Sequence, residues 1–590
     1  MNNRPDSGSA AYLRGLGVSP GIAVATAVLY RSRVMSTPAH TIGADDAESE
    51  WDRLDAAKAA TRRQLTDLRE RLGACSSSGE AGIIDGHLMV VDDEVLVAET
   101  RKEIFDLRHN AEWAVRNVAN KYIAQFSEAD DALFRERADD IADVARRILR
   151  NLMGVKDELP GQWDRPCVVV AENLTPSETL ALPRDVVKAV VLDRGSLTSH
   201  AALVIRALGI PAVFGLEGVS RTAVSGQQIA VDGGKGLVLL NPSDADLARL
   251  LGLAERRREI LASLRPLRDE PAVTPDGFRV RLFANIENVD DLASLDANGA
   301  EGIGLFRTEY LWLASGRPVG EEEQVAAYRA AMAAMGGRPV VIRVYDLGGD
   351  KFMGGVGLGN NESNPFLGLR SLRYLLKNED VLRMQFRAIL RAAESGNVNI
   401  LLPMVTELTE LKRTRRILED CVRDLAAAGT PRPMPKLGIM IEVPSAALIA
   451  PFMMKHADFV SIGSNDLTQY TMAADRTNPS VSHLYQPAHP AVLRLIKMSA
   501  DAAHAASLPL CLCGEMASNP VLAVLLLGMR FESLSMSASA IPVVKALVRG
   551  VPVADAEKLA QAALAAGSSG TVLELARGFL ARYVPDLLTV

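Results

Sequence analysis

The chain has 590 residues, of which 48% are hydrophobic and 23% charged, a composition typical of a globular protein with about two to four domains. The formal net charge of -7 is small for this length and the basic residues are scattered, which argues against nucleic acid as a partner. No stretch approaches the run of about 18 uncharged apolar residues that a membrane span needs, and the polar start lacks the layout of a secretory signal.

The five cysteines, at positions 75, 167, 421, 511 and 513, show no spacing typical of a disulfide framework or a zinc site. Free thiols are the normal state in a reducing compartment. The sequence therefore predicts a cytoplasmic protein.

The first 150 residues contain three segments with different predicted structures. Residues 1–12 are polar, and we expect them to be disordered. Residues 13–30 are β-branched and glycine-rich, which predicts strands around a turn at Ser19-Pro20-Gly21. From 45 to 153 the hydrophobic residues recur with helical spacing and there is little strand signal, so a bundle of about four helices is expected there.

Short apolar strands return between 166 and 240, as PCVVVAE, AVVLD, PAVFG and GLVLLN. We expect them to form one compact α/β domain from residues 13–44 and 154–240, with 45–153 inserted in it. Residues 241–270 are charged and helical in pattern, and they are interpreted as a linker helix.

The remaining residues, 271–590, alternate strand-like and helical segments. Eight units of this kind in one domain predict a closed (β/α)8 barrel, with an open doubly wound sheet as the alternative. A dinucleotide-binding domain is disfavoured because no strand here leads into G-x-G-x-x-G. The eight strand-like runs are RLFANI (281–286), GIGLF (302–306), PVVIRVYD (339–346), NILLPM (399–404), LGIMIE (437–442), DFVSIG (458–463), PLCLCG (509–514) and FESLSM (531–536). The fold class is thus multidomain α/β.

Polar side chains gather where these strands end, which is the rim that carries the active site in barrel enzymes. Glu442 and Asp466 follow neighbouring strands and could share one Mg²⁺ ion. Any one of the rim residues could instead be a helix cap or a surface residue. Guanidinium groups suit phosphate and carboxylate, and the loop glycines before the lysine let the backbone approach an anion. The candidates for anion binding are Arg307, Arg343, Arg370, Arg476 and Lys351. Asn285, Asp346, Asn465, Cys513 and Glu515 end or follow strands at the same rim.

A second signal lies in the α/β domain, where residues 193–203 read DRGSLTSHAAL. Thr198, Ser199 and His200 stand at the start of a predicted helix, whose free amides and hydroxyls favour a phosphate. A capping hydroxyl followed by a histidine with ordinary hydrogen bonds is the alternative. The anion site predicted elsewhere in the chain favours a phosphorylated histidine.

Several long motifs resemble Enzyme I of the bacterial sugar phosphotransferase system, a family of phosphoenolpyruvate-utilising enzymes. They are T-S-H-A-A, G-L-F-R-T-E, R-V-Y-D-L-G-G-D-K, N-P-F-L-G-L-R, I-E-V-P, S-I-G-S-N-D-L-T-Q-Y and C-G-E-M, and the similarity runs from Ser19-Pro20-Gly21 to the end of the chain. The T-S-H motif and the barrel alone are less specific, because pyruvate phosphate dikinase and phosphoenolpyruvate synthase share both.

The resemblance implies a swivelling phosphohistidine domain and a chemical role for each candidate. His200 would carry the phosphoryl group, with Thr198 in support, and Cys513 would give the proton to C3 of the enol. Glu442 and Asp466 would hold Mg²⁺. Phosphoenolpyruvate would be bound by Arg307, Arg343, Arg370, Arg476, Asn465 and Lys351. The helical insertion would bind the carrier protein HPr, and the barrel would form a homodimer.

Two residues depart from the family pattern. Ser196 stands where a second glycine is usual, which would stiffen that turn. Glu287 follows Ala284-Asn285-Ile286, where a small residue is more usual. Neither change removes a reacting group.

Two other functions remain as alternatives. An ATP-using dikinase or synthase would need a nucleotide-binding domain ahead of the histidine domain, and the sequence contains no Walker-type loop. A regulatory docking protein with an inactive barrel would not need the full set of charged rim residues. Both are therefore disfavoured.

Overall fold

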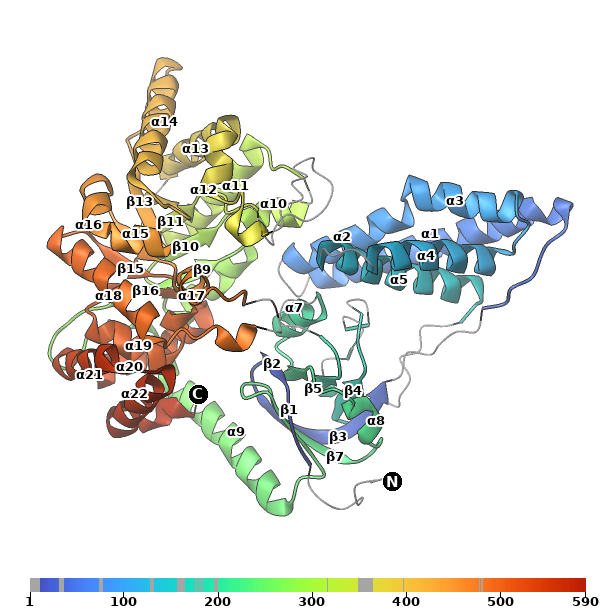
Figure 1. Ribbon diagram of the computed structural model, residues 1–590, viewed down its shortest axis with the longest axis horizontal. Coiled ribbons are helices and arrows are strands. Elements are labelled where there is room, and N and C mark those ends of the chain that lie inside the picture. Colours follow the sequence, from blue (N-terminus) through green and yellow to red (C-terminus); the bar gives the residue numbers. More distant parts are fainter. Residues whose placement is uncertain are drawn as a thin grey trace. The chain divides into compact units, whose positions relative to one another are not determined.

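The computed structural model divides into two compact units, residues 1–255 and 256–590 (Figure 1). It describes residues 11–30, 37–73, 78–127, 132–155, 165–175, 178–179, 182–183, 185–195, 200–315, 317–348, 364–395, 397–476, 478 and 481–589. None of the helices in these ranges is long and apolar enough to cross a membrane.

The first unit contains an eight-stranded mixed sheet with the order β1-β8-β7-β3-β4-β5-β6-β2. Its central strands β4 and β5 are almost continuously apolar, as expected for strands that are covered on both faces. The strands are β1 (Ala11–Arg14), β2 (Leu16–Ser19), β3 (Ile22–Tyr30), β4 (Cys167–Ala171), β5 (Val187–Leu192), β6 (Ala212–Phe214), β7 (Gln228–Asp232) and β8 (Leu237–Leu240). Two helices, α7 (His200–Ala207) and α8 (Val219–Thr222), connect them.

The sequence predicted most of these strands, with two differences. We expected residues 1–12 to be disordered, but β1 begins at Ala11 and pairs with β8, so the predicted boundary was wrong. Residues 1–10 lie outside the described ranges. Strand β7 was not predicted. It has only three apolar residues in a row, and its place in the sheet comes from pairing with β3 and β8 on either side.

Between β3 and β4 the chain forms a helical bundle. The two strands are parallel neighbours, with Thr26 opposite Cys167, so the bundle is an insertion between adjacent strands of one sheet. The expected number was about four helices, whereas the described residues contain five. They are α1 (Ala47–Gly73), α2 (Ser78–Val91), α3 (Glu94–Phe105), α4 (Ala111–Ser127) and α5 (Ala132–Leu152). Helix α3 begins where the Asp93 carboxylate accepts hydrogen bonds from the amides of Val95 and Leu96, which separates it from α2.

The segment predicted as a linker forms helix α9 (Asp244–Leu264), which continues into a short 3-10 turn, Arg265–Asp269. In the second unit the buried Lys545 ammonium donates a hydrogen bond of 2.6 Å to the carbonyl of Arg268. That bond fixes the end of the linker to the barrel helix α20 (Ile541–Gly550).

The second unit is a closed barrel of eight parallel strands. Pairing between β16 and β9, with Ser533 opposite Arg281, closes it and excludes the open sheet. All eight predicted runs are strands: β9 (Arg281–Ile286), β10 (Ile303–Arg307), β11 (Val340–Arg343), β12 (Val398–Leu402), β13 (Lys436–Ile441), β14 (Val460–Ile462), β15 (Leu510–Leu512) and β16 (Ser533–Met536).

Helices surround this barrel and cover its outer face (Figure 1). They bury the apolar sides of the strands in the largest hydrophobic core of the protein. These helices are α10 (Glu309–Ser315), α11 (Glu321–Met335), α12 (Leu372–Lys377), α13 (Glu379–Ala392), α14 (Leu408–Ala427), α15 (Pro444–Leu448), α16 (Ala450–Met453), α17 (Ser464–Met472), α18 (Pro490–Ala505), α19 (Pro520–Gly528), α20, α21 (Val553–Ala565) and α22 (Ser569–Tyr583).

Candidate active site at the barrel rim

The predicted rim residues come together because their strands are parallel and end on the same side of the barrel. Arg307 is the last residue of β10 and Arg343 the last of β11, and the two face each other in the strand register. Glu442 follows β13 directly, and Cys513 follows β15.

The centre of the site is a buried network of opposite charges. The Arg370 guanidinium donates two hydrogen bonds of 3.1 Å to the two oxygens of Asp346. Asp346 also lies 3.3 Å from Arg343, which pairs in turn with Glu309. All four side chains are buried. Burial alone would lower the pKa of Arg343, but the charges of Glu309 and Asp346 outweigh it and raise that pKa.

A loop with a strained backbone positions Arg370 in this network. Ser371, the next residue, has a φ of 60° and a ψ of −129°, and its amide donates a 2.6 Å hydrogen bond to the carbonyl of Leu347. Gly348 has a φ of 106°, and a Cβ atom there would lie 2.8 Å from the Cα of Arg370. Only glycine therefore allows this close approach of the two loop segments.

Arg307 lies at the outer edge of the network. Its Nε is 3.5 Å from the buried Glu309 carboxylate, and its guanidinium lies 4.8 Å from the centre of the Tyr310 ring. Its Nη1 donates a 2.5 Å hydrogen bond to Glu287, a partially exposed side chain. Burial opposes the charge of Arg307, but Tyr310 and the two glutamates outweigh burial and raise its pKa.

Glu442 and Asp466 are both buried and lie close enough to influence each other's charge. The Glu442 carboxylate accepts a 2.7 Å hydrogen bond from the amide of Met404, and Asp466 accepts one of 3.2 Å from Arg370. Burial first, and the charge of Asp466 second, raise the pKa of Glu442 to about 8. The strand end packs so tightly here that a Cβ on Gly463 would lie 2.5 Å from the Glu442 carboxylate.

These two carboxylates would suit a Mg²⁺ ion, because burial and the charge of Asp466 raise the pKa of Glu442 and a nearby cation would favour its ionised form. Among the described residues, no three histidine, cysteine, aspartate or glutamate side chains form a metal cluster. A bound ion would therefore take its other ligands from water and substrate, which is usual for Mg²⁺.

Asn465 and Arg476 lie on and just after helix α17. The Asn465 side chain exchanges hydrogen bonds of 3.2 and 3.0 Å with the side chain and amide of Glu515. Arg476 interacts with Tyr485, whose pKa burial raises to about 12 against the lowering effect of that arginine. The charges of Glu515 and Asp466 also raise the pKa of Tyr485. The segments that carry Arg476 and Tyr485 therefore border the rim.

Cys513 is buried at the top of the barrel interior, packed with Leu305 and Met440. Its sulfur accepts a 3.2 Å hydrogen bond from the hydroxyl of Ser461, and burial raises the pKa of its thiol to about 11. Cys511 also interacts with Ser461, so the two thiols lie on the same face of the strand. Burial raises the pKa of the Cys511 thiol to about 12.

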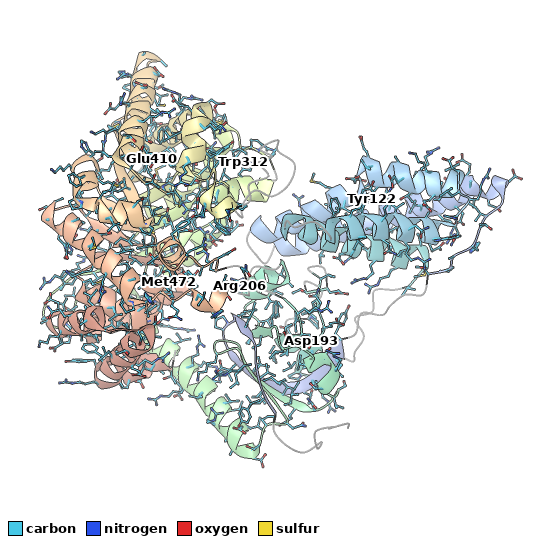
Figure 2. The ribbon with its side chains drawn as sticks, in the orientation of Figure 1. Tyr122, Asp193, Arg206, Trp312, Glu410 and Met472 are labelled. Atoms are coloured by element: carbon cyan, nitrogen blue, oxygen red, sulfur yellow. The ribbon has the colours of Figure 1, made fainter. Side chains whose placement is uncertain are left out.

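His200, the predicted phosphohistidine, belongs to the first unit. Its backbone begins helix α7, just after β5. Asp193, which follows β5 (Figure 2), holds the loop end through a 3.0 Å hydrogen bond from the amide of Ser220. Thr198, Ser199 and Lys351 are predicted site residues that lie outside the described ranges.

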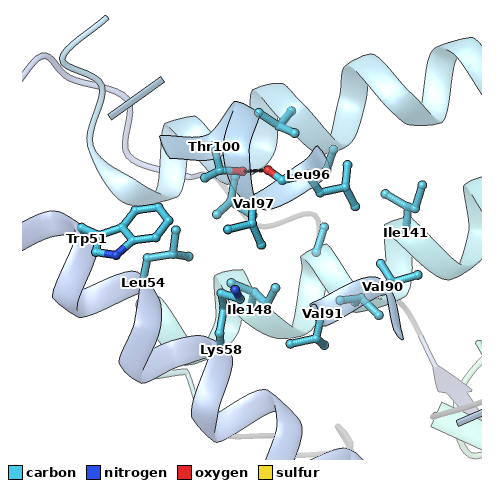
Figure 3. Close-up of a pocket in the computed structure, with 15 residues that line it drawn as sticks. Trp51, Leu54, Lys58, Val90, Val91, Leu96, Val97, Thr100, Ile141 and Ile148 are labelled. Carbon is cyan, nitrogen blue, oxygen red and sulfur yellow. Dashed lines mark hydrogen bonds between the residues drawn. The ribbon is translucent and has the colours of Figure 1, made fainter. Parts of the chain in front are cut away.

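Two cavities in the first unit do not extend the site. One, of about 60 Å³, lies inside the helical bundle (Figure 3); it is lined mainly by apolar side chains, and the Thr100 hydroxyl is bonded to the carbonyl of Leu96. The other, of about 360 Å³, contains two arginines and two glutamates, whose charges cancel. Its Glu178 carboxylate already accepts a 2.6 Å hydrogen bond from Tyr30 and lies 3.6 Å from Arg146.

Sequence reasoning missed three side chains of the rim. Glu309 was visible only as part of the R-T-E motif, and its burial beside two arginines could not be anticipated. Tyr310 supports Arg307, and the Tyr470 hydroxyl accepts a 3.1 Å hydrogen bond from Arg370. The only available signal was their closeness in sequence to predicted site residues.

The chain matches three family models of phosphoenolpyruvate-utilising enzymes: an N-terminal domain over residues 14–137, a mobile domain over 163–236 and a phosphoenolpyruvate-binding domain over 262–553. It is 40% identical over 570 residues to a phosphoenolpyruvate-protein phosphotransferase of Listeria innocua, covering 96% of this chain and 99% of that protein. The corresponding values are 41% over 556 residues (94% and 96%) for the protein of Enterococcus faecalis, and 37% over 569 residues (96% and 99%) for that of Haemophilus influenzae.

Among solved structures, a solution structure of an Enzyme I protein is 31% identical, with a TM-score of 0.35, covering 41% of this chain and 98% of that one. The sequence relatives, which span nearly the whole chain, carry the family assignment.

The buried network yields a prediction for stability. Replacing Asp346 by Asn should lower the free energy of unfolding of the barrel by about 3 kcal/mol, because two buried guanidinium groups lose a shared charged partner. Urea unfolding measures the change. The matched control is Asp420→Asn, which weakens partly exposed ion pairs with Arg383 and Arg423 and should cost less than about 1 kcal/mol. Equal losses in the two variants would contradict the importance of the network.

Proposed function

This chain belongs to the phosphoenolpyruvate-protein phosphotransferase family, and we propose that its barrel rim binds phosphoenolpyruvate while His200 carries the phosphoryl group. It catalyses phosphoryl transfer from phosphoenolpyruvate, the first step of a phosphotransferase system. The buried Arg343 and Arg370 and the partly exposed Arg307 support the placement of the substrate, since guanidinium groups bind phosphate and carboxylate through paired hydrogen bonds. We assign Arg476, Asn465 and Lys351 to substrate binding as well.

In the proposed reaction, a neutral imidazole nitrogen of His200 attacks phosphorus in line with the bridging oxygen. The P–N bond forms as the P–O bond breaks, and the leaving group is the enolate of pyruvate. Such transfers depend mainly on positioning and charge neutralisation. The arginines neutralise the phosphoryl oxygens, and Thr198 supports the phosphorylated histidine. Because His200 and the rim belong to different units, the α/β domain must bring the histidine to the barrel and carry it away again.

Glu442 and Asp466 would hold Mg²⁺ beside the substrate. A bound Mg²⁺ ion would supply positive charge to the phosphoryl and carboxylate oxygens. The Glu442 carboxylate accepts a hydrogen bond from the amide of Met404, and that of Asp466 accepts one from Arg370, so each carboxylate is held in place.

Cys513 would give a proton to C3 of the enolate. Its raised pKa keeps the thiol protonated at neutral pH, which a proton donor requires. The carbonyl of Cys513 accepts a 3.1 Å hydrogen bond from Asn285, which fixes the strand end from across the barrel. After donation, the thiolate would regain a proton from solvent.

The acceptor is proposed to be HPr, bound by the helical insertion. Met89 and Val95 are 65% and 56% exposed and lie where α2 and α3 meet. Exposed apolar side chains of this kind are typical of protein-binding surfaces.

We also propose a homodimer through the barrel and a cytoplasmic location. Leu448 and Phe452 are 61% and 63% exposed on α15 and α16, two neighbouring helices of the barrel exterior. A chain that sediments only as a monomer would remove the dimer from the proposal. The four described cysteines are free thiols, which agrees with a reducing compartment.

The first test identifies the phosphorylated residue. With labelled phosphoenolpyruvate and Mg²⁺, the wild type should take up acid-labile phosphate and release pyruvate, and adding HPr should remove the label. His200→Gln should abolish labelling. The matched control, His456→Gln in the barrel, should keep it. Label on any histidine other than His200 would overturn the assignment.

The second test concerns the metal. Glu442→Gln or Asp466→Asn should raise the Mg²⁺ concentration needed for half-maximal pyruvate release by about tenfold or more, since one carboxylate holds Mg²⁺ poorly. Mn²⁺ binding followed by electron paramagnetic resonance provides a direct measurement. Unchanged metal dependence in both variants would show that the two carboxylates only support the rim.

The third test concerns the proton. Cys513→Ala should keep the affinity for phosphoenolpyruvate but slow pyruvate release by about 10²-fold, as expected for loss of a general acid. Protonation at C3 should then lose its facial preference, which deuterium incorporation into substrate labelled at C3 reveals. Cys511→Ala is the control and should cost stability but little rate. Full rate and unchanged selectivity in Cys513→Ala would assign the proton to another group, with Glu515 the next candidate.

A further inference from the structure

Glu287 makes a contact that the proposed reaction does not use. Its carboxylate accepts a 2.5 Å hydrogen bond from Nη1 of Arg307, one of the arginines assigned to phosphoenolpyruvate. Its side chain is 42% exposed, whereas that of Arg307 is 27% exposed. Glu287 therefore covers the solvent side of a guanidinium that a substrate anion must reach.

The other sides of Arg307 are fixed. Glu309 lies 3.5 Å from its Nε and is fully buried, and the face of the guanidinium lies over Tyr310. Glu309 is also paired with Arg343, so it cannot move without breaking the central network. Of the two carboxylates on Arg307, only Glu287 is free to leave.

Glu287 is built to move as a side chain alone. Its amide donates a 2.8 Å hydrogen bond to Asp291, which holds the backbone in place. Within the described part of the chain, its carboxylate has no hydrogen bond or ion pair except the one with Arg307. Displacing it thus breaks one partly exposed ion pair and leaves the loop unchanged.

We propose that the Glu287 carboxylate occupies the position on Arg307 that an anionic group of phosphoenolpyruvate takes, so that it competes with substrate and sets the affinity of the site. The inference rests on the proposed function, since it requires Arg307 to bind that substrate. When the substrate anion arrives, Glu287 swings toward solvent. When product leaves, it pairs with Arg307 again and restores the outer ion pair.

The test is the affinity of Glu287→Gln for phosphoenolpyruvate, measured by calorimetry, together with KM and kcat for pyruvate release. Loss of an ion pair of this exposure should tighten binding and lower KM by roughly twofold to fivefold. The turnover number should stay the same or fall, because product release no longer has the carboxylate to help it. Glu287→Asp keeps the charge but withdraws it from Arg307, and should also bind more tightly than the wild type.

Asp290→Asn is the matched control. Asp290 is exposed at the start of the short 3-10 helix that follows Glu287, and its carboxylate has no ion pair with Arg307, so this variant measures only the general effect of one negative charge. Tightening in both Glu287 variants and not in Asp290→Asn supports competition. Equal effects in Glu287→Gln and Asp290→Asn, or weaker binding in Glu287→Gln, would overturn it. A wild type that neither binds phosphoenolpyruvate nor releases pyruvate would instead refute the proposed function, and the inference with it.

Discussion

The buried charge network around Asp346 is the constraint on which the rest of the site depends. Two guanidinium groups and two carboxylates are buried together, which is tolerable only if every charge keeps a partner at hydrogen-bond distance. The network therefore fixes where Arg343 and Arg370 point. In the proposed reaction it would also prepare the rim for an anion before one binds, in the way that preorganised charges lower the barrier of phosphoryl transfer.

Hydrogen bonds from the barrel core hold the strand ends that carry this network. The Gln385 side chain donates hydrogen bonds to the hydroxyls of Thr308 and Tyr328 and accepts one from the amide of Tyr345. The Thr308 hydroxyl in turn donates to the carbonyl of Arg343. Helix α13 is thereby tied to the ends of β10 and β11, so the two arginine-bearing strands keep a common register.

The degree of pairing divides the rim into fixed and adjustable parts. Arg370 donates four hydrogen bonds, to Asp346, Asp466 and Tyr470, and belongs to the fixed part. Arg307 combines a buried inner partner, Glu309, with a partly exposed outer one, Glu287, which we propose the substrate displaces. In the proposed reaction, transfer to a protein acceptor would require a mobile histidine, and His200 belongs to the separate first unit.

The sequence by itself determined the eight barrel strands, the helical insertion and the residue types at the strand ends. Those features depend on local periodicity and on short motifs, which are complete within a few residues of chain. Tertiary structure decided which side chains pair. Arg370 and Asp466 are 96 positions apart and meet only because the barrel closes. Pairing of β13 with β14 places Glu442 beside Asp466, and pairing of β9 with β10 brings Glu287 to Arg307. Such pairing and burial depend on neighbours that no local pattern encodes.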